Sequence, residues 1–151
     1  MADSKQSSTE RIVEILEHWQ DAENRTVAQT TAIIAKSANP LVKLVMDIIR
    51  YDSIMHNRVQ QFIIDSLTVK AISLTPEELG EIWEMVEQHI AMERETIGYG
   101  EELTKLCKLF VQSHLIGYLL TDENKHEKLL TQLEDFKRKL YPYARGSEPE
   151  D

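Results

Sequence analysis

Two glutamates, Glu23 and Glu93, stand where the surrounding sequence pattern calls for apolar residues. Each belongs to a series of mostly apolar residues spaced mainly by three and four, which is typical of a helix face directed at partner helices. A carboxylate buried on such a face is costly unless it is protonated, paired with a cation or bound to a metal. His56 and His126 occupy similar positions in two other series, and Glu123 precedes His126 by three residues, which places both on one face. These five side chains are therefore candidate metal ligands.

The candidate ligands repeat along the chain. A shift of 70 residues places Glu23 on Glu93 and His56 on His126, so the two halves share chemistry as well as apolar pattern. Within each half, the glutamate and the histidine each lie about 16 residues from the expected turn, so an antiparallel helical hairpin brings them level. The repeat therefore predicts that two acidic helices and two histidine helices converge near the middle of a bundle.

Local signals mark the first two helices. Ser7 followed by Glu10 is a plausible capping box for the first helix. Residues 37–40 end that helix, because a proline disfavours helical geometry at the residue before it. A second helix is expected over about residues 41–67.

The third helix has a clear start, whereas the turn after it has no local signal. Thr75 supplies an N-cap, followed by proline at the first helical position and Glu78 at the third. One unbroken helix over residues 76–140 would span roughly 95 Å at 1.5 Å per residue, which a compact domain of this size cannot hold. The length and the 70-residue repeat predict a turn near Cys107, followed by a fourth helix that ends near residue 140.

These elements predict an all-α fold. The chain has only 5 glycines and 4 prolines in 151 residues and lacks the alternating β-branched runs of strands. We expect an antiparallel four-helix bundle built from two repeated helical hairpins. The prediction is one domain over residues 1–151, with a helical core over about residues 9–140 and a disordered tail over residues 144–151.

The ligand pattern resembles that of the ferritin-like di-iron carboxylate superfamily, and most closely its rubrerythrin-like branch. That superfamily uses one glutamate from each of two helices and a Glu-x-x-His motif from each of the other two. The resemblance covers about residues 10–140. It implies that Glu23 and Glu93 are the single glutamates and that Glu123-Asn-Lys-His126 is one of the two motifs.

The second helix departs from the family pattern. His56 is in place, but the residue three positions earlier is Ser53, which is a poor metal ligand. Asp52 is a weaker candidate for the vacant position, and a water molecule is another. A third alternative is that one ion binds well, at the three ligands of the second half of the chain.

The resemblance implies two metal ions, with iron favoured and manganese as the alternative, since carboxylates with few imidazoles suit these metals. It also implies a protein that handles iron or reacts with oxygen or peroxide. It identifies no catalytic residue. An enzyme of this kind would be a di-iron oxidoreductase or peroxidase with an external reductant, because the single cysteine, Cys107, excludes a built-in rubredoxin site.

The composition of the chain disfavours some classes of binding partner. The 17 basic and 26 acidic residues give a net charge of −9, which argues against nucleic acid and anionic membrane as partners. No apolar run approaches the roughly 18 residues of a membrane span, and the N-terminal residues lack the apolar core of a signal peptide. We expect a cytoplasmic protein, and homodimerisation is compatible with such a bundle.

Three alternatives use the same residues differently. The runner-up is a non-catalytic helical bundle, an interaction or scaffold module whose buried Glu and His fix helix register. His89, four residues before Glu93, raises a hemerythrin-like alternative, which the absence of a His-x-x-x-His motif disfavours. Haem held between His56 and His126 is disfavoured by the neighbouring carboxylates.

Overall fold

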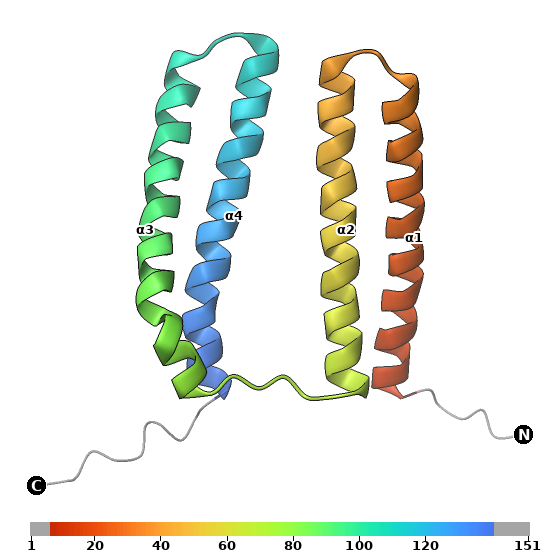
Figure 1. Cartoon of the computed structure of the whole chain (residues 1–151), viewed down its shortest axis with the longest axis vertical. Helices are drawn as coiled ribbons and strands as arrows, with labels where there is room; N and C mark the ends of the chain where they lie inside the picture. The colour runs from red at the N-terminus through yellow and green to blue at the C-terminus, as the bar shows by residue number, and fades with distance from the viewer. Residues whose placement is uncertain (1–6, 141–151) are drawn as a thin grey trace, which may run out of the picture. The chain divides into compact units, whose positions relative to one another are not determined.

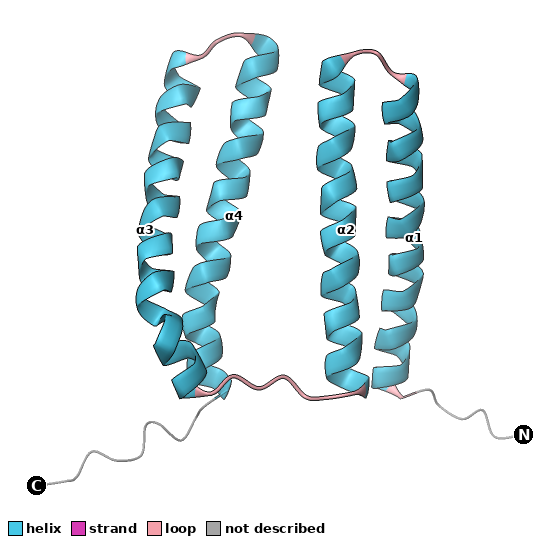
Figure 2. Cartoon of the chain, viewed as in Figure 1, coloured by secondary structure: helices cyan, strands magenta, loops and turns pink. Residues whose placement is uncertain are grey.

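The chain folds into two helical hairpins. A computed structural model describes residues 7–140, apart from the side chains of residues 76, 134 and 137–140. These residues contain no strand and form four helices (Figures 1 and 2), which are α1 (Ser8–Lys36), α2 (Pro40–Thr68), α3 (Pro76–Leu106) and α4 (Phe110–Leu140). Helix α1 packs against α2 and α3 packs against α4. The all-helical class and the two hairpins are thus confirmed.

The chain divides into two compact units, the first ending at Ile72 and the second beginning at Ser73. The first hairpin is α1 with α2, and the second hairpin is α3 with α4. The single domain over residues 1–151 stays a prediction, and the predicted disordered tail over residues 144–151 lies outside the described residues.

The predicted helix starts are confirmed by their capping hydrogen bonds. The Glu10 amide donates to Ser7 Oγ at 3.2 Å, and the Ser7 amide donates to the Glu10 carboxylate at 2.8 Å. The same reciprocal pair joins Thr75 and Glu78 at the start of α3, at 3.1 and 2.7 Å. Both arrangements satisfy amides that have no partner within the helix.

The turns of the two hairpins are equivalent under the 70-residue shift. Helix α1 ends at Lys36 and α3 ends at Leu106, and the next helices begin at Pro40 and Phe110. In the first turn the amide of residue 37 donates to the carbonyl of residue 33 at 2.9 Å, and in the second the amide of residue 107 donates to the carbonyl of residue 103 at 2.8 Å. The turn predicted near Cys107 is therefore present, although the local sequence does not signal it.

In the first helix of each hairpin, the buried residues that contact the second helix are seven residues apart. The buried residues of α1 are Leu16, Glu23 and Thr30. In α3 the buried residues, which have the same spacing, are Leu79, Val86 and Glu93. A repeat of seven keeps one narrow seam of a helix turned towards its partner, as in a coiled coil. One glutamate thus lies in the seam of each hairpin.

A two-helix contact covers only part of each apolar face. Ile12, Trp19 and Ile33 belong to the apolar series predicted for α1, yet each is more than 40% exposed within this structure. The spacing of three and four correctly marks the apolar side of the helix, but only the residues spaced by seven reach the seam. Within residues 7–140, none of the helices combines the length and the apolar character needed to cross a membrane.

Candidate metal site

The candidate site is built around Glu93 in the seam of the second hairpin. The side chain occupies the same seam as Leu79 and Val86 and is 7% exposed. Its Oε2 atom is buried and has no hydrogen-bond partner among the described residues. A buried charged oxygen without a partner is costly, so a proton or a cation is needed there.

Two residues of α4 face the unpartnered oxygen of Glu93. His126 Nδ1 lies 3.7 Å from Glu93 Oε2 and 3.9 Å from Glu123 Oε2. One ligand atom of each of these three residues falls within 4.8 Å of the others, which is close enough to hold one ion. The structure therefore brings together the three ligands that the sequence predicts for the second half of the chain.

The burial of Glu93 and its charged neighbours change its pKa. Burial raises the pKa of Glu93 above its ordinary value of 4.5, and the neighbouring Glu123 carboxylate raises the pKa further. The nearby His126 and His89 lower the pKa, but their effects are smaller. Two ionised carboxylates cannot hydrogen-bond to each other, whereas a single proton can be shared between them. Without an ion, the pair therefore favours holding a proton.

An outer layer of contacts surrounds the three residues. The Thr96 hydroxyl donates to Glu123 Oε2 at 3.1 Å, while Asp122 Oδ2 lies 3.6 Å from His126 Nε2. Asp122 thus approaches the ring nitrogen opposite Nδ1, where a carboxylate orients a metal-binding imidazole. The sequence interpretation did not identify Thr96. The one sequence feature that could have identified Thr96 is the 70-residue repeat, which places it on Thr26.

In the first hairpin the equivalent glutamate and histidine lie close enough to form a hydrogen bond. Glu23 is 7% exposed, and its Oε1 lies 3.2 Å from His56 Nδ1, within hydrogen-bond distance. Ser53, which stands 70 residues before Glu123, is buried at 4% exposure and offers only a hydroxyl. Asp52 is exposed.

The two hairpins therefore differ in how many ligands they bring together. Among residues 7–140, the group of Glu93, Glu123 and His126 is the one set of three or more acidic, His or Cys side chains close enough to share an ion. Glu23 and His56 meet as a pair, and Asp52 does not complete a group with them. The roles of Glu23, His56 and Asp52 as metal ligands stay predictions.

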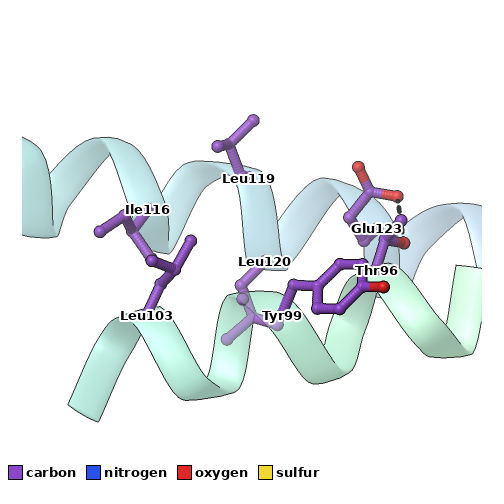
Figure 3. A pocket seen from close by; sticks show the side chains of 8 residues that line it. Thr96, Tyr99, Leu103, Ile116, Leu119, Leu120 and Glu123 are labelled. Carbon is purple, nitrogen blue, oxygen red and sulfur yellow. Dashed lines mark hydrogen bonds between the residues drawn. The ribbon is translucent and has the colours of Figure 1, made fainter. Parts of the chain in front are cut away.

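A groove between α3 and α4 ends at this site (Figure 3). It has a volume of about 180 Å³, and its lining includes Leu103, Ile116 and Leu119. Thr96 and Glu123 form its polar end, joined by their hydrogen bond. The oxygen of Glu123 is therefore approached from a mostly apolar surface.

Comparison with known proteins adds no support to the ferritin-like resemblance. No family model matches the chain, and no curated protein or solved structure shows significant similarity to it. The ferritin-like resemblance therefore rests on ligand type and spacing in the sequence, and it stays a prediction.

Proposed function

We propose that this chain is a metal-binding protein that holds an ion in its second hairpin through Glu93, Glu123 and His126. The observation that carries the proposal is Glu93 Oε2, a buried oxygen without a hydrogen-bond partner that faces a carboxylate and an imidazole. A bound cation would remove the cost of that oxygen and the repulsion between the two carboxylates.

The donor set fits iron or manganese. Two carboxylates and one imidazole leave positions open for water or a small substrate, and no thiolate takes part. Iron held by these residues would be able to supply electrons to oxygen or peroxide, which is the activity that the ferritin-like resemblance implies. The proposal is therefore an iron- or manganese-binding protein with a carboxylate-rich site. A second ion with Glu23 and His56 as ligands is part of the sequence prediction.

Metal stoichiometry tests the proposal. The protein would be titrated with Fe(II) under anaerobic conditions and, separately, with Mn(II), and bound metal would be measured per chain. We expect about one tightly bound ion from the second hairpin, lost in Glu123→Ala. Two ions per chain would extend the proposal to the ligands of the first hairpin.

The matched control is Glu127→Ala, one turn further along α4. Glu127 pairs with Arg94 at 3.1 Å and is not one of the three ligands, so this variant should keep the metal. Circular dichroism would show that both variants remain helical. Absence of bound metal in the wild-type protein, or equal loss in both variants, would contradict the proposal.

The polar seam of the first hairpin favours a second candidate function. Thr30, Ser53 and Gln60 are each 4% exposed, and both amide atoms of Gln60 are buried without hydrogen-bond partners. Buried polar groups of this kind can fix helix register in a scaffold or interaction module. On this alternative the wild-type protein binds no metal, and Glu123→Ala changes only its stability.

A further inference from the structure

We infer that His89 is a positioning residue that fixes the orientation of the Glu93 carboxylate, so that Oε2 faces the ion. This inference rests on the proposed metal site and extends it to a residue outside the three ligands. His89 lies one helical turn before Glu93 on α3.

The two oxygens of Glu93 have different neighbours. His89 Nε2 lies 3.1 Å from Oε1, within ion-pair distance, whereas His126 Nδ1 lies 3.7 Å from Oε2. The terminal torsion of a glutamate is soft, so a carboxylate without an outer contact can rotate. The contact with His89 engages Oε1 and leaves Oε2 as the oxygen that faces His126 Nδ1.

The first hairpin shows the arrangement that arises with a different residue at this position. Trp19 stands 70 residues before His89, and its neutral indole cannot form an ion pair with a carboxylate, although an indole N–H can donate a hydrogen bond, as Trp83 does to Glu87. There Glu23 Oε1 lies 3.2 Å from His56 Nδ1, and the two form a hydrogen bond. In the second hairpin the corresponding distance of 3.7 Å is beyond a hydrogen bond, so Nδ1 of His126 is not committed to Glu93.

His89 acts through Glu93 and not as a fourth ligand in this arrangement. Its nitrogens are not part of the group whose ligand atoms lie within 4.8 Å of one another. Its side chain is 54% exposed, so its removal should have little effect on the packing of the hairpin. Contacts of this outer kind tune metal affinity by about 10- to 100-fold.

The test compares Mn(II) affinity in wild-type protein, His89→Ala and His89→Gln. We expect His89→Ala to weaken Mn(II) binding about 10- to 100-fold and His89→Gln to restore part of the loss, because a glutamine amide can donate a hydrogen bond to Oε1. His114→Ala is the control, since His114 is also exposed and its Nδ1 contacts the carbonyl of residue 110 instead of a carboxylate. This control should bind Mn(II) as the wild type does.

Pulsed EPR of the Mn(II) forms supplies a readout that a general structural effect would not give. One coordinated imidazole should be seen in the wild type and in His89→Ala. Unchanged affinity in His89→Ala would overturn the inference, as would loss of a coordinated imidazole in that variant, which would make His89 a ligand. If the wild type binds no Mn(II) or Fe(II), the proposed function itself fails.

Discussion

At the scale of single residues, Glu93 is a charged side chain at a buried position of a helix seam. It occupies a seam position that Val86 and Leu79 fill with apolar side chains, yet it has a buried oxygen without a partner. Such a group destabilises the protein, and under the proposed function it would gain a cation as its partner. A residue that weakens the free fold and gains a partner on binding is typical of a functional position.

Replacement of Glu93 by glutamine should therefore stabilise the metal-free protein in a pH-dependent way. The pKa of Glu93 is raised in the folded state, so folding binds a proton and stability is greatest below the unfolded pKa. Stability is then lost as the pH rises through the folded pKa. Glu93→Gln lacks this titration, so its advantage should be small at pH 4 and about 1 kcal/mol at pH 8.

Urea unfolding at the two pH values, with metal chelated, measures this difference. Glu127→Gln serves as the control, because it removes an exposed ion pair with Arg94 and should change stability by less than about 1 kcal/mol. An advantage of Glu93→Gln that is equal at pH 4 and pH 8 would show that the carboxyl does not titrate as the structure indicates.

At the scale of helices, the close approach of α3 and α4 depends on Gly100. A Cβ atom added at Gly100 would lie 3.1 Å from Leu120 Cδ1 and 3.4 Å from Leu120 Cβ. A Cβ added at Gly98 would meet nothing within 4 Å. The two glycines share a helix but differ in what faces them, so they form a matched pair.

Alanine substitutions at these glycines should separate helix propensity from packing. Gly98→Ala should stabilise the protein by about 1 kcal/mol, because alanine is the better helix former. Gly100→Ala should gain less than Gly98→Ala, since Leu120 has to shift by a few tenths of an ångström. Thermal unfolding of the two variants provides the comparison. Equal gains would mean that α3 and α4 do not approach closely at Gly100.

The helices themselves were predictable from sequence, and the contacts between them were predictable only in part. Ser7, Thr75 and the Asn39-Pro40 pair mark helix ends by local hydrogen bonding, which the sequence shows directly. The turn at residues 107–109 has no such signal and was inferred from length and repeat. Spacing also predicted that Glu93, Glu123 and His126 meet.

The finer contacts depend on helix rotation and rotamers, which spacing does not fix. Consecutive helical residues point about 100° apart, so with Ser53 in the seam the neighbouring Asp52 is exposed. The sequence showed that His89 could reach the face of Glu93, but not which oxygen it would approach. Thr96 on α3 donates a hydrogen bond to Glu123 on α4, and the residue pattern along a single helix does not show such a contact.

At the scale of the whole chain, the two hairpins are variations on one repeated unit. Under the 70-residue shift, the Asn24–Asn57 hydrogen bond of the first hairpin corresponds to the Arg94–Glu127 ion pair of the second. The residues at the site differ at one ligand, where Ser53 replaces the glutamate found at position 123.

The change Ser53→Glu should therefore install a third ligand in the first hairpin. The new carboxylate would lie three residues before His56, as Glu123 lies before His126. We expect one more bound Mn(II) or Fe(II) per chain than in the wild type, measured by the same titration. Ser53→Gln is the control, because it adds the same bulk at a buried position without the charge.

Either of two results would contradict this expectation. An unchanged metal content in a helical Ser53→Glu protein would mean that position 53 does not determine the difference between the hairpins. An equal gain of metal in Ser53→Gln would show that the added carboxylate is not the cause.

The position of Glu93 in a helix seam also has a consequence for the lifetime of the protein. An ion bound at 100 times its dissociation constant would add about 2.7 kcal/mol to stability, which lowers the unfolded population about 100-fold. Proteases that degrade the transiently unfolded chain would then remove the metal-free protein faster than the metal-bound protein. The amount of this protein in a cell would thus rise and fall with the supply of its metal, without any change in its synthesis.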